Sequence, residues 1–180
     1  MAGDNKSRCK VAPKQFAHKH ADYIYAYALS NKELKSLAQT IQYHLSFFSP
    51  FKTIKLRSEL GFLYAFLGTL TLKKCSEAFP EIHIDIINKI SKLYVDKLLH
   101  LIPNRNYSDY QKRLNVWEKL FTNFEDSDDY EKSISVLAAT FYEFLTDTPC
   151  DESKKLMLIM RFNGYMENFI IGFNDSMKDL

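Results

Sequence analysis

The chain has few of the residues that make tight turns, cross-link chains or bind metals. Its 180 residues include five glycines and three cysteines. So few glycines argue against a fold built from many tight turns, because such turns often need the positive φ angles that glycine adopts easily. The cysteines, Cys9, Cys75 and Cys150, are odd in number and none lies in a CxxC pair. This spacing predicts neither a disulfide framework nor a zinc site, and we expect reduced thiols.

Long uninterrupted apolar runs are also missing. The longest candidate, residues 60–72, is interrupted by two glycines and two threonines and is shorter than the roughly 18 residues of a membrane span. The tyrosine-rich segment 23–29 follows basic residues, but it is short and is preceded by Asp22, unlike a secretory signal peptide. We therefore expect a cytoplasmic protein without a membrane span.

Proline is equally sparse, and its positions are informative about the fold. All five prolines lie between amphipathic segments and never inside one: Pro13, Pro50, Pro80, Pro103 and Pro149. Proline lacks a backbone donor and clashes inside a helix, so it is tolerated at the first turn and in connections. Ser30 with Glu33 and Ser108 with Gln111 add two capping boxes. We predict an all-α fold, a single-domain bundle of about six to eight helices.

The segment near residues 51–79 is the most hydrophobic part of the chain. It is apolar on nearly all sides around residues 62–67, and a helix of that kind is surrounded by other helices. We therefore predict a central hydrophobic helix near residues 51–79. Residues 1–12 are polar and basic and are expected to form a flexible tail, which leaves residues 13–180 as a single all-α domain.

Apolar residues at helical spacing predict the buried side of each helix. The expected stripe of the first helix contains Phe16, Tyr23, Ile24, Tyr27 and Ala28. The expected stripe of the last helix contains Leu156, Met160, Met166, Phe169 or Ile170, and Phe173.

Asn163 and Gly164 interrupt the stripe of the last helix. Asparagine followed by glycine favours a turn, so a kink or break in the helix, or a close helix crossing at Gly164, is expected there. The alternative is a ligand site or interface at this point, with Arg161, Phe162, Asn163, Tyr165 and Met166 as its candidate residues. Under either interpretation a polar residue on a buried stripe needs a hydrogen-bond partner.

No motif commits the chain to one chemistry. The sequence contains no GxSxG elbow, no glycine-rich phosphate loop and no paired Glu-x-x-His motifs of a di-iron bundle. His18, His20 and Asp22 are close in sequence, but His20 points away from His18 on a helix and leaves too few metal ligands. We expect no metal, no cofactor and no catalytic residue, although a triad assembled in space would leave no such mark.

Charge is distributed unevenly although the net charge is only +2. Residues 118–152 hold ten acidic and two basic side chains. The acidic run consists of Glu125, Asp126, Asp128, Asp129 and Glu131. It fails the pattern of a calcium-binding loop and suits a helix N-terminus or an acidic surface for a partner.

Three functions are compatible with these observations. The leading hypothesis is a non-enzymatic protein-interaction module, an adaptor, regulator or inhibitor that uses charged and aromatic surfaces to bind a protein partner or form a homodimer. The second is a bundle that binds a small apolar ligand, beside Asn163 or against the face of Gly61 and Gly68. The third is a nucleic-acid-associated protein that uses its basic N-terminal half.

Overall fold

A computed structural model describes residues 11–45, 50–103, 107–121 and 127–178. It contains seven α-helices and one π-helical segment, and no strand occurs in these ranges. The elements are α1 (Pro13–Tyr23), η1 (Ile24–Ala28), α2 (Asn31–Thr40), α3 (Pro50–Ser76), α4 (Ile84–Leu101), α5 (Tyr107–Leu120), α6 (Ser127–Thr146) and α7 (Glu152–Met177). The prediction of an all-α helical bundle is confirmed.

The helices pack around α3, which is buried on all sides from Ser58 to Gly68. This confirms the central hydrophobic helix. Its two glycines permit close packing, because a Cβ added at Gly61 would lie 2.6 Å from Ile102 and one at Gly68 would lie 2.6 Å from Tyr94. The hydroxyl of Tyr94 donates to the backbone carbonyl oxygen of Tyr64 over 3.0 Å, which fixes α4 against α3.

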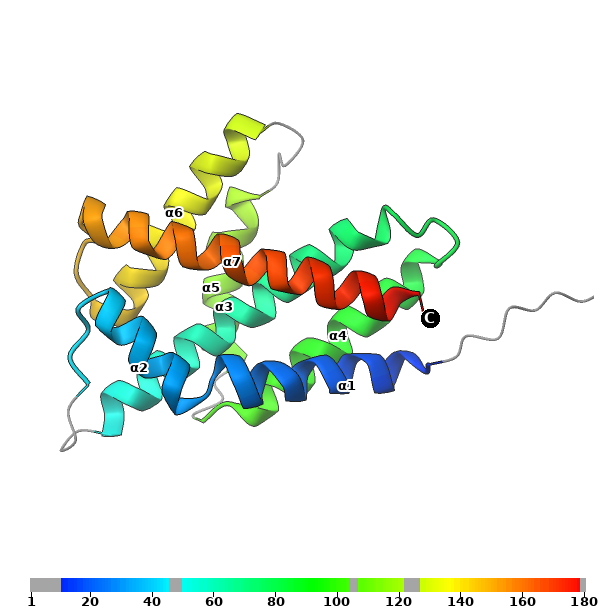
Figure 1. The fold of residues 1–180 in the computed structure, drawn as a ribbon, viewed down its shortest axis with the longest axis horizontal. Helices are drawn as coiled ribbons and strands as arrows, with labels where there is room; N and C mark the ends of the chain where they lie inside the picture. Colours follow the sequence, from blue (N-terminus) through cyan, green and yellow to red (C-terminus); the bar gives the residue numbers. More distant parts are fainter. Residues whose placement is uncertain (1–10, 46–49, 104–106, 122–126, 179–180) are drawn as a thin grey trace, which may run out of the picture.

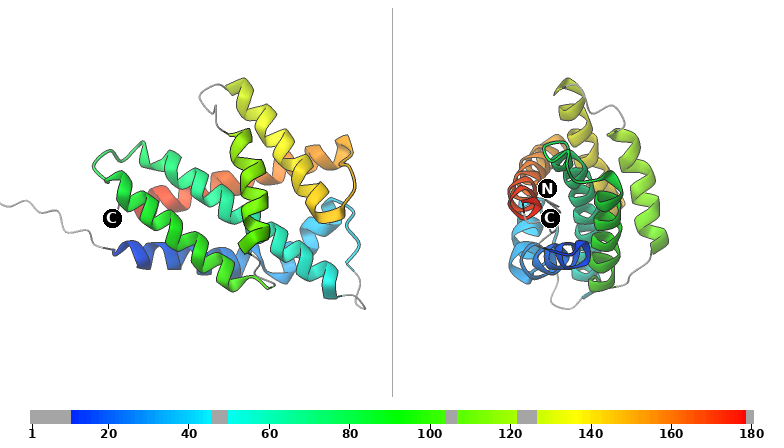
Figure 2. Two further views of the ribbon diagram at one scale, coloured as in Figure 1. Left: turned by 180° about the vertical axis from the view of Figure 1, so that it is seen from behind. Right: turned by 90° about the vertical axis from the view of Figure 1, so that its right-hand side faces the viewer.

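Helices distant in sequence lie side by side in the bundle. α1 packs on α4, and α7 packs on both α3 and α6. In Figure 1, α7 runs along the near side of the bundle, in front of α3 and α4. The end-on view in Figure 2 places α7 at the edge of the molecule, so one side of this helix faces the core and the other faces outward.

The predicted stripe of the first helix is only partly correct. Phe16 and Ile24 are buried, but Tyr23 and Tyr27 are 58% and 66% exposed, and their rings contact each other in a tilted arrangement. The chain widens into the π-helical segment η1 from Ile24 onward. A π-helix has more residues per turn than an α-helix, so the spacing that a regular helix would give is lost there.

Helix α2 begins and ends with identifiable caps. The Ser30 hydroxyl accepts a hydrogen bond from the backbone N–H of Glu33, as the capping box predicts. At the other end Gln42 has φ 55°, and the N–H of Tyr43 donates to the carbonyl of Ala38 over 2.7 Å. This is a Schellman motif with glutamine at the left-handed position that glycine usually occupies.

We expect Gln42→Gly to stabilise the protein by about 1 kcal/mol, because glycine adopts the left-handed conformation without a steric penalty. Chemical unfolding followed by circular dichroism measures this change. Gln39→Gly is the control, since it places glycine inside the same helix and should destabilise by up to about 1 kcal/mol. A loss of stability in Gln42→Gly would contradict the assignment of this cap.

Within the described ranges, no helix combines the length and the apolar character that crossing a membrane requires.

Candidate functional site

Helix α7 carries two apolar faces. The inner face packs into the core and consists of Leu158, Phe162, Tyr165, Met166, Phe169, Phe173 and Met177. The outer face consists of Leu156, Met157, Met160, Gly164, Ile170 and Ile171. Its apolar side chains are exposed by 59% for Leu156, 43% for Met157, 76% for Met160, 37% for Ile170 and 63% for Ile171. A Cβ added at Gly164 would have no atom within 4 Å.

Two expectations about this helix are therefore wrong. Leu156 and Met160 belong to the outer face and not to the buried stripe. The break expected at Asn163 and Gly164 is also absent, because the helix continues from Glu152 to Met177. Tertiary contacts explain the continuity, because the residues around Asn163 are held on three sides by α2, α3 and α6, and packing of this kind overrides local turn preference.

The Arg161 side chain ties α7 to α2. It donates to the Glu33 carboxylate over 3.2 Å and to the Ser36 hydroxyl over 2.6 Å. The Tyr165 hydroxyl donates to the same carboxylate over 3.0 Å, and burial, followed by the charge of Glu33, raises the pKa of Tyr165. Glu33, whose backbone N–H donates to the Ser30 cap of α2, thus also receives hydrogen bonds from two residues of α7.

Asn163 has the partner that a half-buried amide requires. The Tyr130 hydroxyl of α6 donates to the Asn163 side-chain oxygen over 2.7 Å and also lies 3.4 Å from the Met166 sulfur. Beside this contact the Phe162 ring is fully buried, with its centroid 5.4 Å from that of Phe141. The candidate residues 161–163, 165 and 166 are thus placed in contacts that hold α7 to its neighbours.

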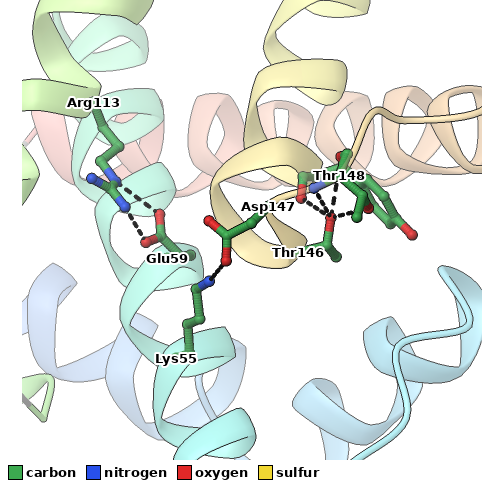
Figure 3. Close-up of polar contacts among 7 residues, drawn as sticks. Lys55, Glu59, Arg113, Thr146, Asp147 and Thr148 are labelled. Carbon is green, nitrogen blue, oxygen red and sulfur yellow. Dashed lines mark hydrogen bonds and ion pairs between the residues drawn. The ribbon is translucent and has the colours of Figure 1, made fainter.

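A buried ion pair links α3 to α5 (Figure 3). Arg113 donates two hydrogen bonds to the Glu59 carboxylate, over 2.6 and 3.0 Å, and the Glu59 side chain is only 5% exposed. The guanidinium also lies 4.5 Å from the centre of the Phe144 ring. Burial raises the pKa of Glu59, and the hydrogen bonds and charge of Arg113 oppose that rise. Because both carboxylate oxygens are occupied and shielded, we assign this pair a structural role and not a catalytic one.

A second, exposed ion pair lies beside it. Lys55, one turn before Glu59 on α3, donates to Asp147 over 2.7 Å at the end of α6. The hydrogen bond from Lys55 lowers the pKa of Asp147. Figure 3 shows the two pairs side by side, joining α3 to α5 and to the end of α6.

His20 lies inside the bundle and not at a solvated helix start. Its ring centre is 4.5 Å from that of Phe16 and 4.7 Å from that of Phe173, and its Nε2 atom is buried without a hydrogen-bond partner. Burial, and secondly the charge of Lys19, lowers the pKa of His20 to about 4. The imidazole is therefore neutral in the folded protein near neutral pH.

This histidine predicts a loss of stability in acid. The unfolded chain binds a proton at His20 near pH 6.5 but the folded chain does so only near pH 4, so stability falls as the pH drops between these values. From pH 7 to pH 5 we expect this group to cost about 2 kcal/mol. Unfolding at the two pH values should show this dependence in the wild type and in a His44→Gln control. His20→Leu should lose this pH dependence. If its unfolding free energy changes with pH as much as that of the wild type, His20 is not the group responsible.

A cleft of about 460 Å³ lies at the end of α2. Its lining is Lys35, Ala38, Gln39, Gln42, Tyr43, His44 and Leu45, and the Lys52 ammonium lies over the Tyr43 ring at 5.8 Å. Five of the seven lining residues are polar, but most of the surface that they present to the cleft is apolar. Residues 46–49, which follow Leu45 in the sequence, lie outside the described part of the chain.

The two places where a pocket for an apolar ligand was expected are occupied by side chains. Ile102 packs against Gly61 and Tyr94 packs against Gly68, while Tyr130 covers the Asn163 amide. A ligand in either place would have to displace these groups.

The described residues contain no group of three or more histidine, cysteine, aspartate or glutamate side chains that could hold a metal ion. Asp22 instead pairs with Lys97 over 3.1 Å. Of the acidic run, Glu125 and Asp126 lie outside the described residues, and the side chains of Asp128 and Asp129 are not described. Glu131 is exposed on α6.

The basic residues of α3 are spread along the helix. Lys55 and Lys73 are separated by about 27 Å at the rise of an α-helix. Lys55 pairs with Asp147, and Arg57 donates to the Asn31 side chain over 2.6 Å. Lys55 and Arg57 are thus each held by a contact within the chain.

Comparisons with protein-family models, with curated proteins and with solved structures found no match to this chain.

Proposed function

We propose that this chain is a non-enzymatic protein-interaction module that docks to a helical protein surface through the outer face of α7. The observation that supports this proposal is the exposure of five large apolar side chains along one side of one helix. A contiguous exposed apolar surface is costly in water and is typical of a protein contact site. Methionine and branched aliphatic side chains also adapt well to the side of another helix.

The polar groups support a binding function more than a chemical one. Glu59 is enclosed by Arg113, and Glu33 is engaged by Arg161 and Tyr165. An enzyme would need reactive groups that converge on an open site. The outer face of α7 presents mainly apolar surface with the carboxylate of Glu167 among it.

Site-specific photo-cross-linking tests this proposal. A benzophenone amino acid at position 160 of the full chain, in its own cells, should give light-dependent protein adducts. The same probe at position 84 is the control, because Ile84 is 54% exposed on α4, away from the outer face. Adducts at position 160 and not at 84 support the proposal. No adduct at position 160, or equal adducts at both positions, would refute it.

A further inference from the structure

We infer that the partner of the outer face of α7 is a second copy of this chain, paired through its own α7 in antiparallel orientation with the two helices crossing at Gly164. This inference rests on the proposed function, since it names the partner of the same surface.

Among the described glycines, Gly164 has the most open surroundings within the single chain. Gly61 and Gly68 are each pressed by a side chain that a Cβ would meet at 2.6 Å, whereas a Cβ at Gly164 would meet nothing within 4 Å. Glycine inside a helix lowers helix stability relative to almost any other residue. A glycine in the middle of an exposed apolar face is accounted for if another helix approaches closely at that point.

The outer face is complementary to itself about this glycine. Met157 precedes Gly164 by seven residues and Ile171 follows it by seven, a spacing of about 10 Å on either side. In a two-fold pair with the axis through Gly164, each Met157 therefore faces the partner's Ile171. A two-fold dimer requires apolar positions to be matched in this way, because both subunits use the same surface for the contact.

Charge favours the antiparallel orientation over the parallel one. Asp151 and Lys154 lie near the start of α7 and Asp175 and Lys178 lie near its end, each pair joined within the helix. In the antiparallel pair the exposed Lys178 lies near the partner's exposed Asp151. In a parallel pair each of these charges would face its own copy, and the two helix dipoles would repel each other.

Cysteine cross-linking tests the orientation. In a chain with Cys9 and Cys150 replaced by serine, the double variant Met157→Cys/Ile171→Cys should form a covalent dimer with a short bismaleimide. Each single variant should not, because two copies of position 157 would be about 21 Å apart along the helices. Both positions are exposed, so these variants should fold, as circular dichroism can confirm.

A covalent dimer from the double variant alone supports the inference. Cross-linking of Met157→Cys by itself would indicate a parallel or unspecific contact and overturn it, and so would the absence of any cross-link. If light-dependent adducts at position 160 contain another protein while the double variant does not cross-link, the self-pairing fails and the proposed function stands. If neither experiment gives an adduct, both fail.

The variant Gly164→Leu should weaken the dimer without weakening the folded single chain. In the single chain the new side chain enters open space, so the folding equilibrium constant should be unchanged or should rise by up to roughly fivefold. In the dimer it pushes the helices apart, and the dissociation constant should rise at least about tenfold. Unchanged or tighter association by sedimentation equilibrium would overturn the crossing point.

Discussion

Arg113→Ala is expected to destabilise the protein by about 3–5 kcal/mol, because it leaves the carboxylate of Glu59 buried without a counter-charge. Glu59 is 5% exposed and receives both of its strong hydrogen bonds from Arg113. The substitution also removes the guanidinium from the Phe144 ring. Urea unfolding followed by the fluorescence of the buried Trp117 measures the loss, which should shrink in acid as Glu59 becomes protonated.

Two further variants show whether the effect comes from the unpaired charge. Glu59→Leu combined with Arg113→Met removes both charges and should recover most of the lost stability, as replacement of whole buried pairs often does. Lys55→Met breaks the neighbouring exposed pair with Asp147 and should change stability little. A small effect of Arg113→Ala, or a large effect of Lys55→Met, would contradict the structural role assigned to the buried pair.

Phe162→Ala is expected to cost about 3–5 kcal/mol, whereas Met160→Ala should change stability by less than about 0.5 kcal/mol. The two residues are neighbours on α7, but the Phe162 ring is fully buried against Phe141 and Met160 is 76% exposed. Removal of a buried ring leaves a cavity, while shortening an exposed side chain leaves none. Both variants are measured with the chain dilute enough to be monomeric.

This pair of variants tests which side of α7 faces the core. A large loss in Met160→Ala together with a small loss in Phe162→Ala would show that the inner and outer faces are exchanged. The other residues of the two faces of α7 would then also have to be exchanged between the core and the surface.

The helices themselves could be predicted from local signals. Pro13 and Pro50 begin α1 and α3, and Ser30 caps α2 through Glu33. In α6 the apolar residues Ile134, Leu137, Phe141 and Leu145 recur at helical spacing, and all four are buried. These features depend on residues only a few positions apart, which is why the sequence alone reveals them.

The face of α7 could not be predicted in the same way. The helix has apolar residues at helical spacing on two sides, and both Met160 and Phe162 fit such a pattern. Periodicity shows that a face is apolar but not whether another helix covers it. The richer aromatic content of the inner face is the one signal in the sequence that distinguishes the two sides, because large rings contribute most to a core.

The polar contacts of the candidate site could not be predicted either, because they join residues that are far apart in the sequence. Glu59 and Arg113 are 54 residues apart, and Arg161 and Glu33 are 128 apart. Which charges meet depends on how α3, α5, α2 and α7 cross, and no local pattern encodes that. The break expected at Asn163 does not occur, and the hydrogen-bond partner of its side chain is Tyr130, which comes from α6.

Sedimentation equilibrium of the purified full chain over a wide concentration range most directly tests whether the outer face of α7 binds a second copy. The wild type and an Ile84→Lys control should both shift from one chain mass to twice that mass as concentration rises. Met160→Lys should remain at one chain mass over the same range while keeping the wild-type circular dichroism. A wild type that stays monomeric throughout, or a Met160→Lys variant that dimerises as tightly as the wild type, would contradict the assignment of this surface.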